Sequence, residues 1–146
     1  MFVGPTLKYG GHALSQTGGH GHFRRADDDA PPLCRHGVGR IVDGVDAARD
    51  EIRKGADHIK IMASGGVASP TDRIASTQFC DDEIRAVVEE ATAAERYVAA
   101  HAYTVVAVNR CLQLGVRSIE HGNLIDDESV GLFLAHDAFL VPTLVT

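Results

Sequence analysis

From residue 43 onward, short apolar segments alternate with amphipathic segments of helical length. The apolar segments have strand length and span residues 58–62, 97–101, 116–121 and 138–141. The segments between them carry apolar residues at helical spacing and span residues 43–54, 81–95, 105–114 and 126–135. Strands that alternate with helices in this way indicate a parallel sheet with right-handed crossovers. Because the strands are apolar on both faces, helices must cover one face and the sheet interior the other.

The length of the repeat favours a barrel over a doubly wound sheet. Units in the second half recur about every 20 residues, and no strand leads into the glycine fingerprint of a dinucleotide-binding fold. A further short strand is expected at residues 13–15, inside a region (1–40) rich in glycine and histidine. We therefore predict one α/β domain over residues 1–146, built as part of a (β/α)8 barrel, with regular βα units over 41–146.

Charge and cysteine content exclude several classes of partner. The net charge of −6 argues against nucleic acid and anionic membranes, and no apolar run is long enough to span a bilayer. Cys34, Cys80 and Cys111 are odd in number and far apart, so they indicate neither a disulfide framework nor a thiolate zinc site. A reducing cytoplasm is the expected location.

Three basic side chains fall within or at the end of successive predicted strands. Lys60 lies inside the first regular strand, His101 ends the second and His121 ends the third. In a (β/α) barrel the carboxyl ends of the strands form the active-site face, so these side chains should converge. A single strand-end histidine is more often a hydrogen-bonded structural residue than a ligand. Two at matched positions in adjacent strands favour metal ligands.

Lys60 is the sharper signal because it lies between Ile59 and Ile61, in a strand whose two faces are both covered. Burying an ammonium group is costly, so this lysine must either pair with a carboxylate or change chemically. The following Ser64-Gly65-Gly66 segment is compatible with an anion-binding nest and equally with a tight strand exit.

Four segments together resemble the amidohydrolase superfamily. They are HIKIMASGGVASP around Lys60, VAAHAYT around His101, SIEHGN around His121, and SQTGGHG around His20. The similarity is to the branch of metal-dependent dipeptidases and carboxypeptidases related to prolidase and imidazolonepropionase. It runs over nearly the whole chain, which would form about a third of a full member. The resemblance implies strands three to seven of the barrel, with residues 1–40 supplying the third strand and its loop.

The resemblance also implies roles for individual residues. Lys60 would be carbamylated by CO2 and bridge two divalent metal ions, with zinc the favoured metal, and His101 and His121 would bind the second ion. His20 would bind a substrate carboxylate, and Tyr103, expected at the start of a loop, would contact the substrate. The family's HxH pair and its general acid/base aspartate are not identified in this chain. A His20–His22 pair remains an alternative for the former.

The expected function is hydrolysis of an amide or peptide bond in a small peptide or N-acyl amino acid, by a metal-activated hydroxide. We expect the chain alone to be inactive or nearly so, and either to self-associate through two open strand edges or to be only marginally stable. The alternatives are a hydrolase of cyclic amides, lactones or imidazolones, a non-catalytic metal-binding or scaffolding fragment, and a phosphate-binding barrel that uses Ser64-Gly65-Gly66.

Overall fold

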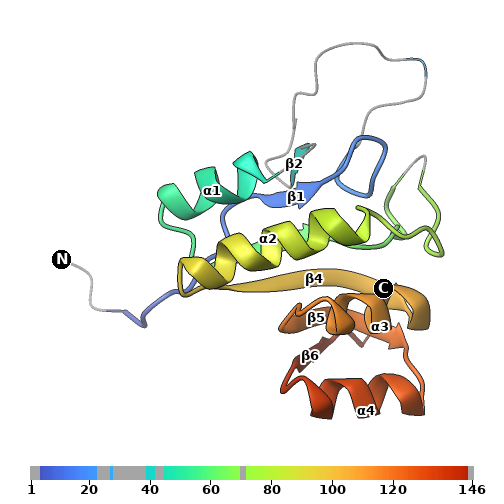
Figure 1. Cartoon of the computed structure of the whole chain (residues 1–146). Coiled ribbons are helices and arrows are strands. Elements are labelled where there is room, and N and C mark those ends of the chain that lie inside the picture. Colours follow the sequence, from blue (N-terminus) through green and yellow to red (C-terminus); the bar gives the residue numbers. More distant parts are fainter. Residues whose placement is uncertain (1–3, 23–26, 28–38, 42–44, 70–71, 145–146) are drawn as a thin grey trace.

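A six-stranded, fully parallel sheet forms the centre of the molecule, in the order β2-β1-β3-β4-β5-β6 (Figure 1). The computed structural model describes residues 4–22, 27, 39–41, 45–69 and 72–144. The strands are β1 (Ala13–Ser15), β2 (Gly39–Ile41), β3 (His58–Met62), β4 (Tyr97–Thr104), β5 (Ser118–Leu124) and β6 (Phe139–Pro142). The helices are α1 (Asp46–Arg53), α2 (Asp81–Ala93), α3 (Val105–Gln113) and α4 (Asp127–Ala135).

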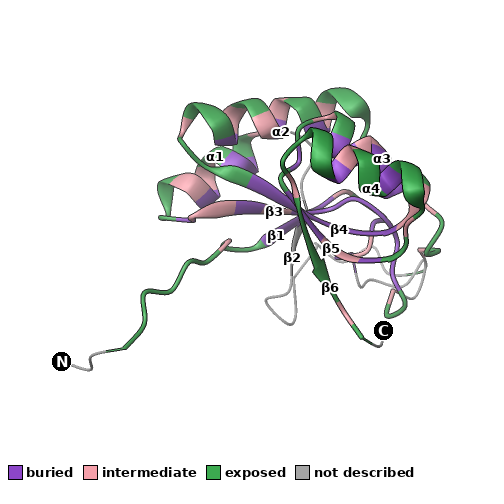
Figure 2. Ribbon diagram, turned by 90° about the horizontal axis from the view of Figure 1, so that it is seen from below, coloured by how far each residue is buried: buried purple, intermediate pink, exposed green. Residues whose placement is uncertain are grey.

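All four helices lie on one face of the sheet, and the core fills the layer between them (Figure 2). The strands contribute apolar side chains that are almost fully buried, such as Ile59, Val98 and Ile119. The helices meet them with one apolar stripe each, represented by Ile84 on α2 and Leu112 on α3. Burial of these stripes explains why the helical spacing read from the sequence is retained in the fold.

The predicted fold class is confirmed, since parallel strands alternate with helices in an open sheet. One strand was not predicted: β2 pairs with β1 as a sixth strand at the edge of the sheet. Its three residues, Gly39-Arg40-Ile41, have no alternation that could signal a strand, and the pairing is made by the fold. The strands β4 and β5 also end later than predicted, at Thr104 and Leu124.

The helix boundaries follow the prediction with two differences. Helix α2 begins at Asp81 as predicted but ends at Ala93, two residues before the predicted end, and its N-cap position belongs to Cys80. Glu83 accepts a hydrogen bond from the Cys80 N–H, and Asp81 is paired with Arg110 of α3. Helix α1 begins at Asp46, and the predicted start at residue 43 lies outside the described residues.

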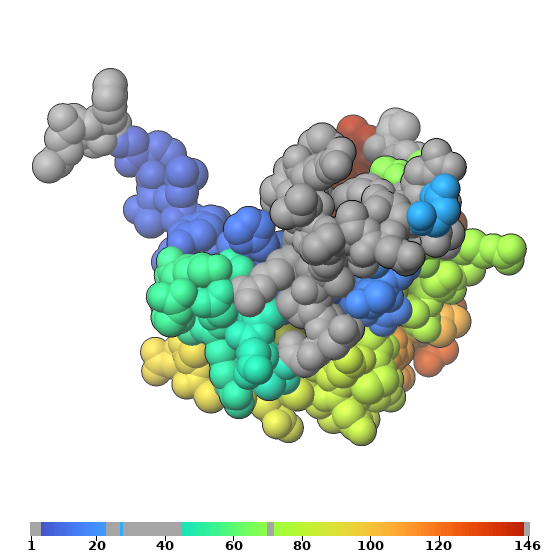
Figure 3. Space-filling view, turned by 90° about the horizontal axis from the view of Figure 1, so that it is seen from above, coloured from blue at the N-terminus to red at the C-terminus, as the bar shows by residue number. Residues whose placement is uncertain are grey.

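The sheet does not close, and its two edges differ in length. At one edge lies the three-residue β2, and at the other lies β6, whose four residues are all exposed. The start of the described N-terminal segment projects from the body of the molecule (Figure 3). Lys8 forms an ion pair with Asp57. Among the described residues no helix has the length and apolar character that a membrane span requires.

Candidate active site

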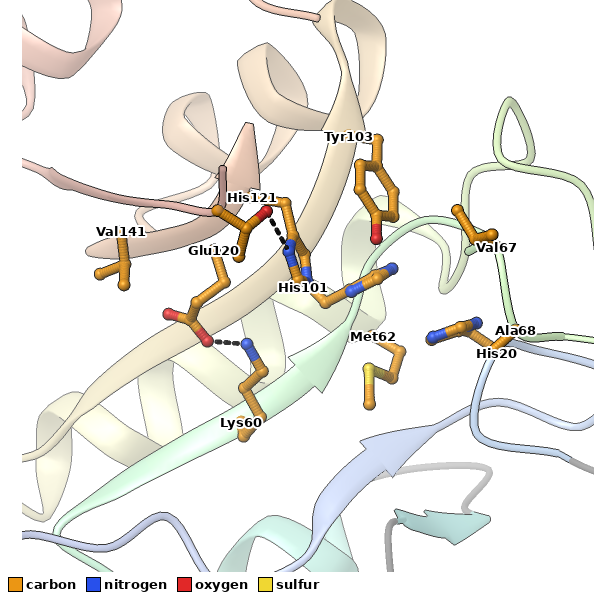
Figure 4. Close-up of a pocket in the computed structure, with 11 residues that line it drawn as sticks. His20, Lys60, Met62, Val67, Ala68, His101, Tyr103, Glu120, His121 and Val141 are labelled. Carbon is orange, nitrogen blue, oxygen red and sulfur yellow. Dashed lines mark hydrogen bonds and ion pairs between the residues drawn. The ribbon is translucent and has the colours of Figure 1, made fainter. Parts of the chain in front are cut away.

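A pocket of about 500 Å³ opens at the carboxyl ends of the central strands (Figure 4). The strands β3 to β6 and the loops after β1 and β3 supply its walls. The lining residues are His20, Lys60, Met62, Val67, Ala68, His101, Tyr103, Glu120, His121, Val141 and Thr143. All five residues proposed from the sequence as metal or substrate ligands are in this set, so the structure brings them together.

Lys60 is paired with Glu120, which the sequence reading did not single out. The lysine side chain is 19% exposed, and its Nζ contacts the Glu120 carboxylate across β4. The second oxygen of that carboxylate accepts a hydrogen bond from the Ser118 Oγ at 3.1 Å. Burial lowers the pKa of Lys60 to about 8. The amine therefore has a carboxylate partner, which is the first of the two outcomes expected for a lysine in this strand. Because its pKa is lowered, removing its proton near neutral pH requires little free energy.

His101 is buried and its tautomer is fixed by a neighbouring loop. Its Nε2 lies 3.1 Å from the carbonyl oxygen of Gly65, which can only accept, so Nε2 carries the proton. Burial lowers the pKa of His101 to about 3, with smaller contributions from His20, His121 and Lys60. The ring is thus neutral, and its Nδ1 carries the lone pair that a metal ion would require.

His121 reaches the pocket through an unusual backbone conformation. Successive residues of a strand normally point to opposite faces, yet Glu120 and His121 both line the pocket. His121 has φ of 74°, in the left-handed region that residues other than glycine rarely adopt. The register of β4 against β5 shifts just beyond the Ala102–His121 pair. The left-handed turn therefore lets one strand deliver two consecutive side chains to one site, a local strain typical of functional positions.

The ring of His121 is held from both sides. Its Nδ1 lies 3.1 Å from the hydroxyl of Thr143, just beyond β6, which leaves Nε2 for a ligand. Tyr103 stacks on the ring with centroids 4.7 Å apart, and His101 meets it edge-on at the same separation. Burial, Lys60 and His20 all lower the pKa of His121, so this imidazole is also kept neutral.

His20 comes from the loop after β1 and stacks on His101, with ring centroids 4.4 Å apart and an angle of 12°. A Cβ atom at Gly66 would lie 2.2 Å from the His20 ring, so only glycine allows this approach. Burial lowers the pKa of His20, and the nearby Asp72 carboxylate opposes this effect. A neutral His20 with an N–H group facing the pocket can donate a hydrogen bond to a carboxylate.

Tyr103 was predicted at the start of a loop, and this placement is wrong. The strand β4 runs through to Thr104, so Tyr103 is a strand residue with 6% exposure. Tyr103 follows His101 by two positions, so both side chains point to the same face of the sheet. The two rings pack edge-on, with their centroids 4.9 Å apart. His101 and His121 likewise lie three residues inside the strands that they were predicted to end.

The sequence and this fold match known proteins over nearly the full chain. Residues 4–146 fit the model of the amidohydrolase family. The chain belongs to the amidohydrolase family. A prolidase whose crystal structure holds N-methylphosphonate-L-proline is 56% identical with a TM-score of 0.91, over 99% of this chain and 37% of that one. A Xaa-Pro dipeptidase with bound methionine is 32% identical with a TM-score of 0.81, over 97% of this chain and 36% of that one.

A curated relative gives the same picture. Ochratoxinase of Aspergillus niger is 37% identical over 86% of this chain, which corresponds to 29% of the ochratoxinase sequence. This amidohydrolase chain therefore spans well under half the length of the proteins that it matches. The predicted resemblance, including the similarity to prolidase-type peptidases, is confirmed.

The donor set of this amidohydrolase chain fits a divalent metal ion. Two neutral imidazoles face the pocket from adjacent strands, and each has its other ring nitrogen held by a protein oxygen, as metal-binding histidines usually do. No group of three or more histidine, cysteine, aspartate or glutamate side chains with metal-binding placement occurs among the described residues. Lys60 lines the same pocket, and it would need an anionic form to serve as a further ligand.

Other candidates from the sequence take structural roles. His22 accepts a hydrogen bond from the Gly18 N–H at 2.7 Å and does not line the pocket, which speaks against a His20–His22 ligand pair. The Gly65 N–H donates to the Ser76 carbonyl at 2.9 Å, so Ser64-Gly65-Gly66 forms a strand exit here and not an anion nest. Cys111 is fully buried, and burial raises its pKa to about 12, which makes the thiol inert.

Two residues of the site were missed by sequence reasoning. Glu120 was passed over because it neighbours His121, and alternation along a strand places neighbours on opposite faces. Gln78, which accepts a hydrogen bond from the His20 N–H at 3.2 Å, lies 58 residues from its partner in an irregular loop. The need of a buried lysine for a carboxylate partner is the one signal in the sequence that could have indicated Glu120, which lies two strands away from Lys60.

Proposed function

We propose that this chain carries the lysine and the two histidines of the metal site of an amide-bond hydrolase of the dipeptidase or carboxypeptidase type. The convergence of Lys60, His101 and His121 in one pocket carries this proposal. His101 would bind through Nδ1 and His121 through Nε2, because their other nitrogens are already engaged. Bound metal ions, for which zinc suits the imidazoles, would lower the pKa of a water molecule and polarise the substrate's carbonyl group.

Lys60 enters the proposal as a carbamate. Its pKa of about 8 makes the neutral amine accessible near neutral pH. The Nζ lone pair of the neutral amine forms a bond to the carbon of CO2, one C–O π bond opens, and the nitrogen releases a proton. The product is an anion, which is the kind of group that two neighbouring cations require between them.

The substrate side of the site supports a small molecule with a free carboxylate. His20 lines the pocket and stacks on one side of His101, and Tyr103 lines the pocket beside His101 and His121. Apolar walls formed by Met62, Val67 and Val141 suit an apolar side chain next to the scissile bond. Small peptides and N-acyl amino acids fit this combination. Because one relative is named ochratoxinase, amides other than dipeptides should be tested as substrates as well.

A segment exchange tests the proposal. The matching 37% of the 56%-identical prolidase would be replaced by this chain, and hydrolysis of Xaa-Pro dipeptides measured. We expect the chimaera to retain dipeptidase activity, and His101→Asn to reduce kcat/KM by about three orders of magnitude or more through loss of a ligand. His136→Asn is the matched control, because His136 is exposed beside α4 and remote from the pocket.

Two outcomes would contradict the proposal. One is a folded chimaera that binds metal but hydrolyses no amide, which would favour a non-catalytic metal-binding role. The other is full activity in the His101→Asn chimaera. Preferential hydrolysis of a cyclic amide or lactone would retain the metal site and replace the proposed substrate class.

A further inference from the structure

Gln78 is a fully buried amide at the junction of the two loops that close one side of the pocket. The loop after β1 carries His20, and the loop after β3 runs from Ser64 to Gln78 itself. The side chain is 1% exposed and takes no part in the pocket wall. Burying an amide group destabilises the folded state unless its N–H donors and its carbonyl acceptor all form hydrogen bonds.

The acceptor side of Gln78 holds the backbone of His20. Its Oε1 accepts the His20 N–H at 3.2 Å. The same oxygen lies so close to Gly19 that a Cβ atom there would approach it to 2.4 Å. The loop after β1 therefore contacts the Gln78 amide at two consecutive residues, Gly19 and His20.

The donor side of Gln78 leads to Tyr103. Its Nε2 donates to the Ser64 carbonyl at 3.0 Å and to the Asp72 carboxylate. The hydroxyl of Ser64 in turn accepts the Tyr103 N–H at 3.3 Å. One side chain thus connects, through Ser64, the backbones of two pocket residues that lie 83 positions apart in the sequence (103 − 20).

We infer that Gln78 is a positioning residue that sets the separation between His20 and Tyr103, and with it the length of substrate that the pocket accepts. The inference rests on the proposed function, in which these two residues contact the substrate. Only a neutral amide can accept from one loop and donate to the other at the same time. A carboxylate at position 78 would lack the donor, and an apolar side chain would lack both groups.

Gln16 offers a matched control for Gln78. It also joins the two loops, since its Oε1 accepts the N–H of Phe79, the residue next to Gln78. No hydrogen bond links its side chain to His20, Ser64 or Tyr103 among those found in the described residues. Replacing either glutamine by methionine keeps the approximate volume and removes the side-chain hydrogen bonds that join the two loops at that position.

The experiment compares Gln78→Met and Gln16→Met in the 146-residue chain by two readouts. NMR follows the ring resonances of His20 and Tyr103, and calorimetry follows binding of N-methylphosphonate-L-proline in the presence of zinc. We expect both variants to melt at lower temperatures, Gln78→Met by the larger amount because its side chain loses three hydrogen bonds and that of Gln16 one. Gln78→Met should shift both sets of ring resonances and weaken binding about tenfold, the loss of one to two hydrogen bonds. Gln16→Met should leave the rings unmoved.

Unchanged ring resonances in Gln78→Met, or equal shifts in the two variants, would overturn the inference. Should Gln78→Met not fold, Ser64→Ala removes only the hydroxyl link and is expected to move Tyr103 without moving His20; movement of both or of neither would overturn it. A wild-type chain that does not bind the phosphonate, but whose rings respond to Gln78→Met alone, would contradict the proposed function and leave the positioning role standing.

Discussion

The centre of the sheet and its β6 edge have opposite character. Residues 98–103 of β4 are buried without exception, whereas every residue of β6 is exposed, Phe139 to 60% and Val141 to 49%. The ligand candidates follow the same division. Lys60 and His101 lie on the central strands β3 and β4, while His121 lies on β5, whose outer neighbour is the exposed edge strand β6, and its ring contacts Thr143 just beyond β6.

The difference indicates that the side chains of the site are not all held equally firmly. A side chain on a strand that is packed into the core is held in a fixed position, as catalytic geometry demands. A strand with one free edge and exposed apolar residues is held by its inner neighbour alone, and it is the place where a further strand or a second copy would add. Self-association through this edge remains a prediction.

The comparison predicts a large contrast in stability between two aliphatic residues that pair across β5 and β6. Ile119 is fully buried and Leu140, its register partner, is 37% exposed. Ile119→Ala should lower the free energy of unfolding by about 3–4 kcal/mol, and Leu140→Ala by less than about 1 kcal/mol. Urea denaturation measures both. Equal losses would mean that β6 is covered in solution.

The neutrality of the buried imidazole predicts sensitivity to acid. Unfolded His101 takes up a proton near pH 6.5, and folded His101 only near 3. The unfolded state therefore binds more protons over this window, so the free energy of unfolding falls as the pH decreases from 6.5 towards 3. From pH 6.5 to about 4.5 the loss should be about 2 kcal/mol greater in the wild type than in His101→Gln, measured without added metal. Parallel pH profiles would contradict a buried neutral ring.

Close contact between the loops predicts a smaller but specific effect. The added methyl group of Gly66→Ala must displace the His20 ring, and we expect a loss of about 1–2 kcal/mol and disrupted stacking on His101. Gly131→Ala is the control, because a Cβ atom there meets nothing within 4 Å and alanine favours the helix α4. Thermal melting should show a gain for the control. A higher melting temperature for Gly66→Ala would contradict the close contact between Gly66 and the His20 ring.

The β6 edge of the sheet should affect the site through the contact between Thr143 and His121. Thr143→Val removes the hydroxyl beside the His121 Nδ1 and should weaken zinc binding about tenfold, as loss of an orienting partner usually does. Calorimetric titration with zinc measures the change, and Thr92→Val on the exposed side of α2 provides the control. No change in affinity would show that Tyr103 stacking alone orients the ring.

Patterns local in sequence predicted most of the fold. Helical spacing and apolar runs predicted every helix and five of the six strands, and strand ends predicted the convergence of Lys60, His101 and His121. The strand β2 was missed because three residues without alternation acquire their structure from pairing with β1. Glu120 was missed for a similar reason, since the left-handed turn at His121 that sends both side chains to one face arises only in the folded sheet.

The most direct test of the central claim is zinc K-edge absorption spectroscopy of the zinc-loaded chain, which reports the atoms bound to the metal. The account predicts two imidazole nitrogens at about 2.0–2.1 Å in the first shell, and the loss of one of them in His101→Asn and in His121→Asn. A shell of oxygens alone, or a spectrum unchanged in both variants, would contradict the assignment of these two histidines as metal ligands.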